Sequence, residues 1–89
     1  MIVDKSEFTK IALDLRFHTA TLENLQGQIF DDSYRKGSLM IFRAMVMKKE
    51  LETNFEEEKF YEFESKVDEI SDYIQDIIKS PTIFGTFFQ

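Results

Sequence analysis

Two runs of apolar residues with the same spacing constrain the fold of this chain more than any other feature. In each run the separations alternate between three and four residues, which is the heptad pattern of a helix that packs against another helix. The first run comprises Phe8, Ile11, Leu15, His18, Leu22, Leu25 and Ile29, and the second comprises Phe60, Phe63, Val67, Ile70, Ile74 and Ile77. The fold class is therefore predicted to be all-α.

Local signals predict where the first helix begins. Asp4 is expected to be its N-cap, with Glu7 three residues later, and Val3 and Phe8 stand where a hydrophobic staple places its two residues. The chain is expected to enter this helix within its first few residues.

A central helix is expected to begin near residues 31–33 and to run to about residue 51. Gly27, or the aspartate pair at positions 31 and 32, is expected to end the first helix, and the residues of 31–33 cap helices well. A strand is the alternative for Leu39–Met47, but Met, Ala, Lys and Glu favour a helix. Its apolar residues cover more than one face, so we expect this helix to contact both others, with Met40, Met45 and Met47 in the core.

The third helix is predicted to open with a capping box formed by Thr53 and Glu56. Ser80 and Pro81 are expected to end it, because proline lacks an amide donor and disfavours helical geometry in the preceding residue. Short connections near residues 27–32 and 52–54 require neighbouring helices to be antiparallel. The sequence therefore predicts one domain over residues 1–89, an antiparallel three-helix bundle with an apolar C-terminal tail.

The C-terminal tail is too apolar to be left in water. Its large apolar side chains are Ile83, Phe84, Phe87 and Phe88. Each would contribute roughly 1.5–3 kcal/mol on full burial, so we expect them to dock on the bundle or to mediate oligomerisation. A homodimer is the expected assembly.

Composition limits the compartment and the partners. The chain has no cysteine, a sequence pI near 4.7, and no N-terminal basic segment followed by an apolar run. We therefore expect a cytoplasmic protein with no disulfide, no membrane span and no direct binding to nucleic acid, which requires a basic surface. A partner recognised through charge should be a basic protein.

Catalytic groups are sparse, so we expect neither an enzyme nor a cofactor. His18 is the single histidine, and it is expected to be a core or boundary residue with one hydrogen-bond partner; a role in pH sensing or ligand binding is the alternative. No acidic residue lies three positions before it, as carboxylate-bridged metal bundles require, and the acidic residues lack the turn glycine of a calcium loop. No metal site is predicted.

Negative charge is concentrated between residues 52 and 76, which hold ten acidic and two basic residues. When Phe60 is set at heptad position a, six of these acids fall opposite or beside the apolar run: Glu58, Glu62, Asp68, Glu69, Asp72 and Asp76. They are expected to form a row about 27 Å long on one helix face. Two interpretations remain open, a merely solvated surface and a surface that binds a basic partner.

The solvated interpretation has support of its own. Acidic residues in the first turn of a helix are favourable against its dipole. Five basic residues on the central helix are also available to neutralise the row within the monomer: Arg35, Lys36, Arg43, Lys48 and Lys49.

A compact, acidic, cysteine-free helical chain with Glu58, Glu62, Glu69, Asp72 and Asp76 gathered on one helix resembles the small DNA-mimic inhibitors encoded by phages. The anti-restriction proteins of the Arn type in T-even phages are the nearest in kind. The resemblance covers the third helix, and no motif aligns residue by residue, so it transfers no functional residue. It implies a dimeric acidic protein that blocks host restriction or nucleoid proteins by occupying their DNA sites.

These observations together predict a non-catalytic inhibitor that binds a basic, DNA-binding host protein through its acidic third helix. The alternative is a structural adaptor that binds a partner, or itself, through the apolar tail.

Overall fold

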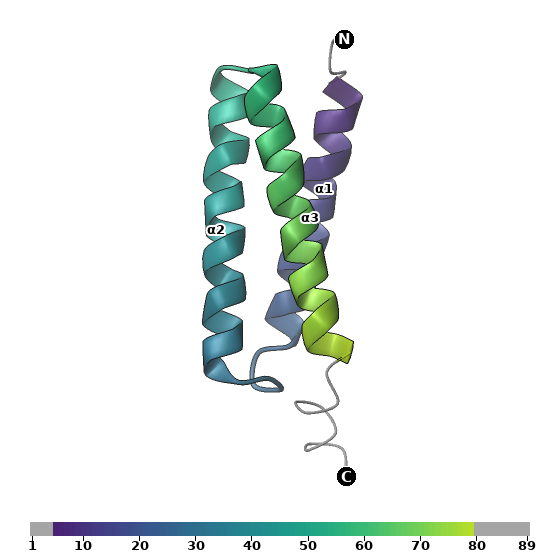
Figure 1. Ribbon diagram of the computed structural model, residues 1–89, viewed down its shortest axis with the longest axis vertical. Coiled ribbons are helices and arrows are strands. Elements are labelled where there is room, and N and C mark those ends of the chain that lie inside the picture. Colours follow the sequence, from purple (N-terminus) through teal and green to yellow (C-terminus); the bar gives the residue numbers. More distant parts are fainter. Residues whose placement is uncertain (1–4, 80–89) are drawn as a thin grey trace.

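The computed structural model describes residues 5–79, which form three helices packed side by side (Figure 1). α1 spans Lys5–Asn24, α2 spans Asp31–Thr53 and α3 spans Glu57–Lys79. Helices that follow one another in the sequence run in opposite directions, so α1 and α3 are parallel, and each helix packs against both others (Figure 1). The predicted antiparallel three-helix bundle is confirmed, and the central helix contacts both of its neighbours as expected.

Both heptad runs face the interior of the bundle. All six apolar residues of the run in α3 are buried, and they are Phe60, Phe63, Val67, Ile70, Ile74 and Ile77. α1 contributes Leu15 and Leu22 to the centre of the core, while Phe8 and Ile11 pack against its edge. Because full burial of one such side chain contributes about 1.5–3 kcal/mol, this seam is the main source of stability.

The first helix ends earlier than its heptad run. α1 stops at Asn24, and a turn follows in which the amide of Gln28 donates to the Leu25 carbonyl oxygen over 2.9 Å. Gly27 has φ of +84°, a conformation that a residue with Cβ rarely adopts. The turn returns Ile29 to the core, where it is buried, although it lies outside the helix.

α2 carries a third heptad run that its composition conceals. The residues facing the core are Tyr34, Gly37, Ile41, Ala44 and Leu51, and with the partly buried Lys48 they follow the same spacing of three and four residues as the other two runs. A Cβ atom on Gly37 would lie 2.9 Å from Leu22 Cδ2 and 3.3 Å from Tyr73 Cε2, so the glycine permits close approach of the helices. The inner face of α2 therefore includes two small residues, Gly37 and Ala44, among larger ones.

Larger apolar residues of α2 consequently face outward. Leu39, Phe42, Met45 and Val46 are exposed, whereas Met40 and Met47 are partly buried against the core. The expectation that Met45 fills the core is wrong, because the positions three and four residues from Ile41 that face inward are taken by Gly37 and Ala44.

The connection between α2 and α3 also differs from its prediction. Thr53 is the last residue of α2, and its hydroxyl donates to the Lys49 carbonyl oxygen over 3.1 Å. It therefore caps nothing in α3, whose first backbone bond runs from the Phe60 amide to the Glu56 carbonyl oxygen at 2.9 Å. The prediction of a Thr53–Glu56 capping box is wrong.

α2 begins within the predicted residues 31–33, at Asp31, but its N-cap is Phe30, so these residues lie inside the first turn instead of capping it.

Several predictions fall on residues outside the described range of 5–79. They are the Asp4 cap, the Val3–Phe8 staple, the helix stop at Ser80 and Pro81, and the tail residues Ile83, Phe84, Phe87 and Phe88.

Candidate functional site

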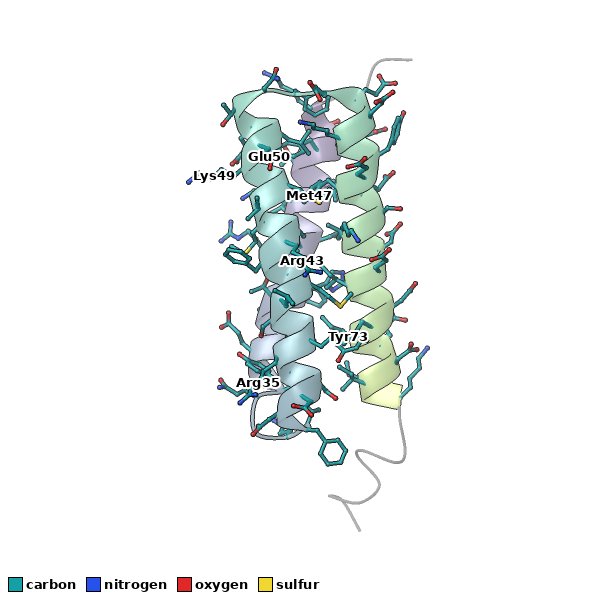
Figure 2. All side chains as sticks on the ribbon, turned by 60° about the vertical axis from the view of Figure 1, so that its left-hand side comes forward. Arg35, Arg43, Met47, Lys49, Glu50 and Tyr73 are labelled. Carbon is teal, nitrogen blue, oxygen red and sulfur yellow. The ribbon has the colours of Figure 1, made fainter. Side chains whose placement is uncertain are left out.

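The six predicted acidic site residues all lie on α3 and are all exposed. Glu58 is in the first turn of the helix, and it lines a shallow hollow together with Glu62 and with Met47 of α2. The others follow along the exposed side of α3: Asp68, Glu69, Asp72 and Asp76. We call these six side chains the acidic face. Figure 2 shows oxygen-tipped side chains along the outer edge of α3. The helix orients them outward because its opposite side is the apolar seam, which is fully committed to the core.

Ion pairs leave most of the acidic face without a partner. The described residues form three ion pairs, Lys48–Glu52, Lys59–Glu56 and Lys66–Glu69, with N···O distances of 4.0, 3.5 and 3.4 Å. Only the last involves the acidic face. Within residues 5–79, the carboxylates of the other five residues of the face have neither an ion pair nor a hydrogen bond.

Lys36 of α2 lies beside α3, with its ammonium group over the Tyr73 ring, but ion pairs between the two helices are absent from residues 5–79. In Figure 2, Arg35 and Lys49 lie on the side of α2 that is turned away from α3. All eleven lysines and arginines of the chain lie within residues 5–79, so the three ion pairs are those of every lysine and arginine with the described carboxylates.

Charge is consequently segregated by helix. α3 carries eight acidic and three basic residues, a net charge of minus five, whereas α1 has three of each and α2 has five basic and four acidic residues. Among the three described helices, net negative charge is therefore confined to α3.

At the border between α2 and α3, Tyr73 makes the polar contacts that join the two helices within residues 5–79. The Tyr73 hydroxyl donates to the Ser33 carbonyl oxygen over 2.9 Å, and Lys36 Nζ lies 5.3 Å from the centre of the Tyr73 ring. In Figure 2 the Tyr73 side chain extends from α3 toward α2. This contact aligns the first turns of α2 with the C-terminal half of α3, where Asp72 and Asp76 project.

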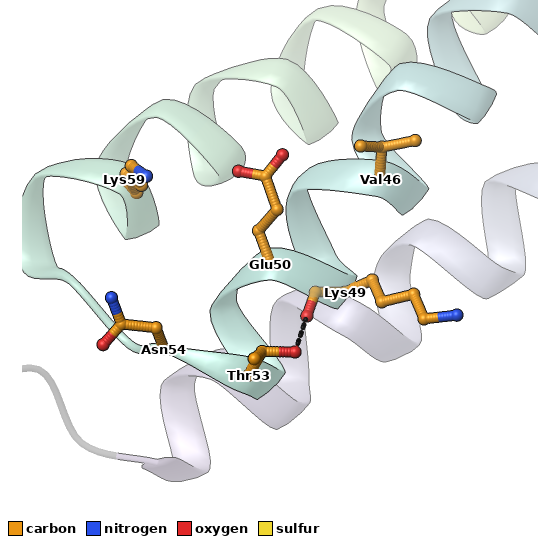
Figure 3. Close-up of a pocket in the computed structure, with 6 residues that line it drawn as sticks. All are labelled: Val46, Lys49, Glu50, Thr53, Asn54 and Lys59. Carbon is orange, nitrogen blue, oxygen red and sulfur yellow. Dashed lines mark hydrogen bonds between the residues drawn. The ribbon is translucent and has the colours of Figure 1, made fainter.

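A hollow of about 400 Å³ near the turn between α2 and α3 offers no alternative site. Its lining includes Lys49, Lys59 and Glu50, but Figure 3 shows the Lys49 ammonium group directed away from Lys59. Lys59 is paired with Glu56 at 3.5 Å. The polar groups do not converge on a common point, as a ligand site requires.

His18 is half-buried at the edge of the core. Its ring lies 5.7 Å from the ring of Phe17 in an edge-to-face arrangement. The expected hydrogen-bond partner is absent among the described residues. Within the same range, no group of three or more histidine or acidic side chains is placed to bind a metal ion.

None of the three described helices is both long and apolar enough to cross a bilayer.

Sequence reasoning missed the exposed apolar residues of α2 and α1. Phe42 is 62% exposed, Met45 51% and Phe17 69%. The signal for α2 was the three-and-four spacing of Gly37, Ile41 and Ala44, which places Phe42 and Met45 outside the inner face. Small residues at heptad positions are easily overlooked, because apolar runs are usually recognised by their large side chains.

Comparison with known protein families, with curated proteins and with solved structures found no match to this chain.

Proposed function

We propose that this protein is a non-catalytic binding protein whose acidic face occupies the DNA site of a basic, DNA-binding protein. The observation that carries the proposal is the exposure of six carboxylates on one side of α3, five of which have no ion pair within residues 5–79. In this proposal the protein acts in the cytoplasm, that of a host cell if a phage encodes it, as an inhibitor of the anti-restriction type.

The charge spacing of the acidic face is comparable to that of one DNA strand. Eighteen residues separate Glu58 from Asp76, which corresponds to about 27 Å along a helix. One strand of B-DNA carries about eight phosphates over that length, because its charges are spaced by about 3.4 Å. Six carboxylates over the same distance offer a basic groove a similar, somewhat sparser row of anions.

The arrangement also carries a cost that a purely structural helix would avoid. Like charges three or four residues apart repel by a few tenths of a kcal/mol, and Asp72 has three such neighbours in Asp68, Glu69 and Asp76. Lysines at alternate positions would remove this repulsion. Their omission along this side supports a role in binding.

A direct test combines charge reversal with displacement by DNA. The protein is immobilised, a nuclease-treated cell lysate is passed over it, and bound proteins are eluted with a short DNA duplex. We expect basic proteins to be released by the duplex, and also by raising salt from about 50 to about 200 mM, because binding through phosphate-like anions is strongly salt-dependent. The variant E62K/E69K/D72K should retain none of them.

The matched control is E7K/D14K/E50K, which changes the net charge equally at exposed positions on α1 and α2. It should retain the duplex-released proteins. Equal retention by both variants, with both folded by circular dichroism, would reject the acidic face as the binding surface. Release by neither DNA nor salt would reject mimicry.

A further inference from the structure

A groove runs along the seam between α1 and α2, on the side of the bundle away from α3. Two adjoining hollows of about 280 and 240 Å³ form it, and they share Thr19, Glu23 and Met45. Phe42 lines one hollow, while Arg16 and Lys48 line the other. The exposed apolar residues Phe42 and Met45 thus lie in a groove with charged groups at defined positions.

The charges along this groove are ordered. Arg16 and Lys48 lie together at one end because α1 and α2 are antiparallel, and the hollow that contains Phe42 has neither of them. Glu23 follows Arg16 by seven residues, which is about 10 Å along α1. The groove therefore has a positive end and a negative end.

This order of charges makes the groove complementary to a second copy of itself that runs in the opposite direction. A purely acidic partner would pair with Arg16 and Lys48 but would face Glu23 with like charge, and a purely basic partner would do the reverse. A second copy of the same groove, rotated by a two-fold axis, matches both ends at once. The axis falls midway between positions 16 and 23, beside Ala20, whose small exposed side chain allows close approach.

We propose that the α1–α2 face binds a second copy of this chain in an antiparallel, two-fold symmetric dimer. Arg16 of each copy pairs with Glu23 of the partner subunit, and Phe42 and Met45 of both copies pack around the axis. Lys48, whose ion pair with Glu52 of its own chain is 4.0 Å long, adds positive charge beside Arg16. This surface is distinct from the C-terminal tail.

The size of the face is adequate for such a dimer. Helices of 20 and 23 residues are about 30 and 35 Å long and about 10 Å in diameter. Side by side they present roughly 600–700 Å² per copy, close to the ~800 Å² per partner of a standard interface. α3 lies on the opposite side, so both acidic faces remain exposed, and the net charge doubles from minus six per chain to minus twelve.

Sedimentation equilibrium of the full chain tests the association. The expected mass is twice the 10.6 kDa of one chain. E23R, which makes the groove wholly basic, and R16E/K48E, which makes it wholly acidic, should each weaken self-association by at least about tenfold, because like charges then face each other across the axis. An equimolar mixture of the two variants restores every opposite-charge pair and should recover the dimer.

Recovery of the dimer in the mixture would show that both variants are folded and that each single variant fails to associate because of its charge. E50R is the control for charge reversal outside the groove. F42K gives a second variant, since Phe42 is exposed in the monomer and its replacement should abolish the dimer while helicity is retained. A monomeric wild-type chain at all concentrations would overturn the proposal. So would a dimer that is unaffected by E23R, R16E/K48E and F42K, which would place the contact elsewhere on the chain.

Discussion

The Tyr73 hydroxyl of α3 donates a hydrogen bond to the Ser33 carbonyl oxygen in the first turn of α2, across 40 residues of sequence and 2.9 Å of space. The ring that carries this hydroxyl passes beside Gly37, where a Cβ atom would lie 3.3 Å from Tyr73 Cε2. The absence of a side chain at Gly37 and the hydrogen bond of Tyr73 are therefore parts of one contact between α2 and α3.

Replacing Tyr73 by phenylalanine should isolate the contribution of this hydrogen bond. The ring keeps its packing, so we expect the free energy of unfolding to fall by about 0.5–1.5 kcal/mol, measured from the urea midpoint at unchanged slope. Tyr61→Phe is the control, because Tyr61 is exposed and its hydroxyl has no hydrogen bond within residues 5–79. Equal losses in the two variants would show that the bond to Ser33 adds nothing.

Gly37→Ala should destabilise the bundle even though alanine is the better helix former. The gain in helix propensity is about 1 kcal/mol, whereas overpacking of a core costs about 1–3 kcal/mol. The new methyl group would lie 2.9 Å from Leu22 Cδ2, so Leu22 and Tyr73 must shift to accept it. We expect a net loss of up to about 2 kcal/mol in urea unfolding.

A double-mutant cycle identifies the cause. Leu22→Val removes both Cδ atoms, so Gly37→Ala in that background should cost less or become stabilising. A higher unfolding midpoint for Gly37→Ala alone would contradict the steric account.

Phe63→Ala should cost about 3–5 kcal/mol, a large part of the stability expected for a domain of this size. Phe63 is fully buried and its ring lies 5.8 Å from that of Phe8. Phe17→Ala removes a side chain that is 69% exposed and should change the unfolding free energy little. Similar thermal midpoints for the two variants would contradict the assignment of the core.

Asp72→Asn should stabilise the protein, because it relieves repulsion from three acidic neighbours at helical spacing. At a few tenths of a kcal/mol per pair, the gain is about 0.5–1 kcal/mol at low salt. It should shrink as salt rises, since the repulsion is screened. Urea unfolding at several salt concentrations measures both effects.

Asp14→Asn is the matched comparison, since Asp14 lies four residues after Lys10 and its charge is favourable there. It should leave stability unchanged or lower it. A salt-independent gain at Asp72 would indicate a cause other than charge.

The two runs of large apolar residues were sufficient to predict the fold, but not the orientation of α2. In α3 the large apolar residues Phe60, Phe63 and Ile70 identify the inner face. In α2 the inner face includes Gly37 and Ala44, so large side chains do not identify it. Which side of such a helix faces the core depends on the volume left by its neighbours, here Leu22 and Tyr73, and this volume is set only when the helices are packed.

The ends of the helices were predicted less well for a related reason. Threonine is a common N-cap residue, yet the Thr53 hydroxyl donates a hydrogen bond to the Lys49 carbonyl oxygen within its own helix. Both arrangements satisfy a polar group, and the choice depends on where the chain reverses direction.

For the acidic face, heptad position alone predicted the exposure of Glu62, Asp72 and the other carboxylates. The lack of ion pairs from α2 could not be predicted, because it depends on the direction of side chains such as Arg35 and Lys49 relative to α3.

With Gly37 and Ala44 on its inner side, α2 packs the core with one face and presents large apolar side chains to solvent with the other. Since Ile41 and Ala44 fill the interior from α2, and Leu22 and Tyr73 fill the space beside Gly37, the outward positions 39, 42 and 46 can be exchanged for other side chains without repacking the bundle. α2 can therefore serve as a scaffold on which new specificities are engineered, with the folding of the molecule left to its inner side.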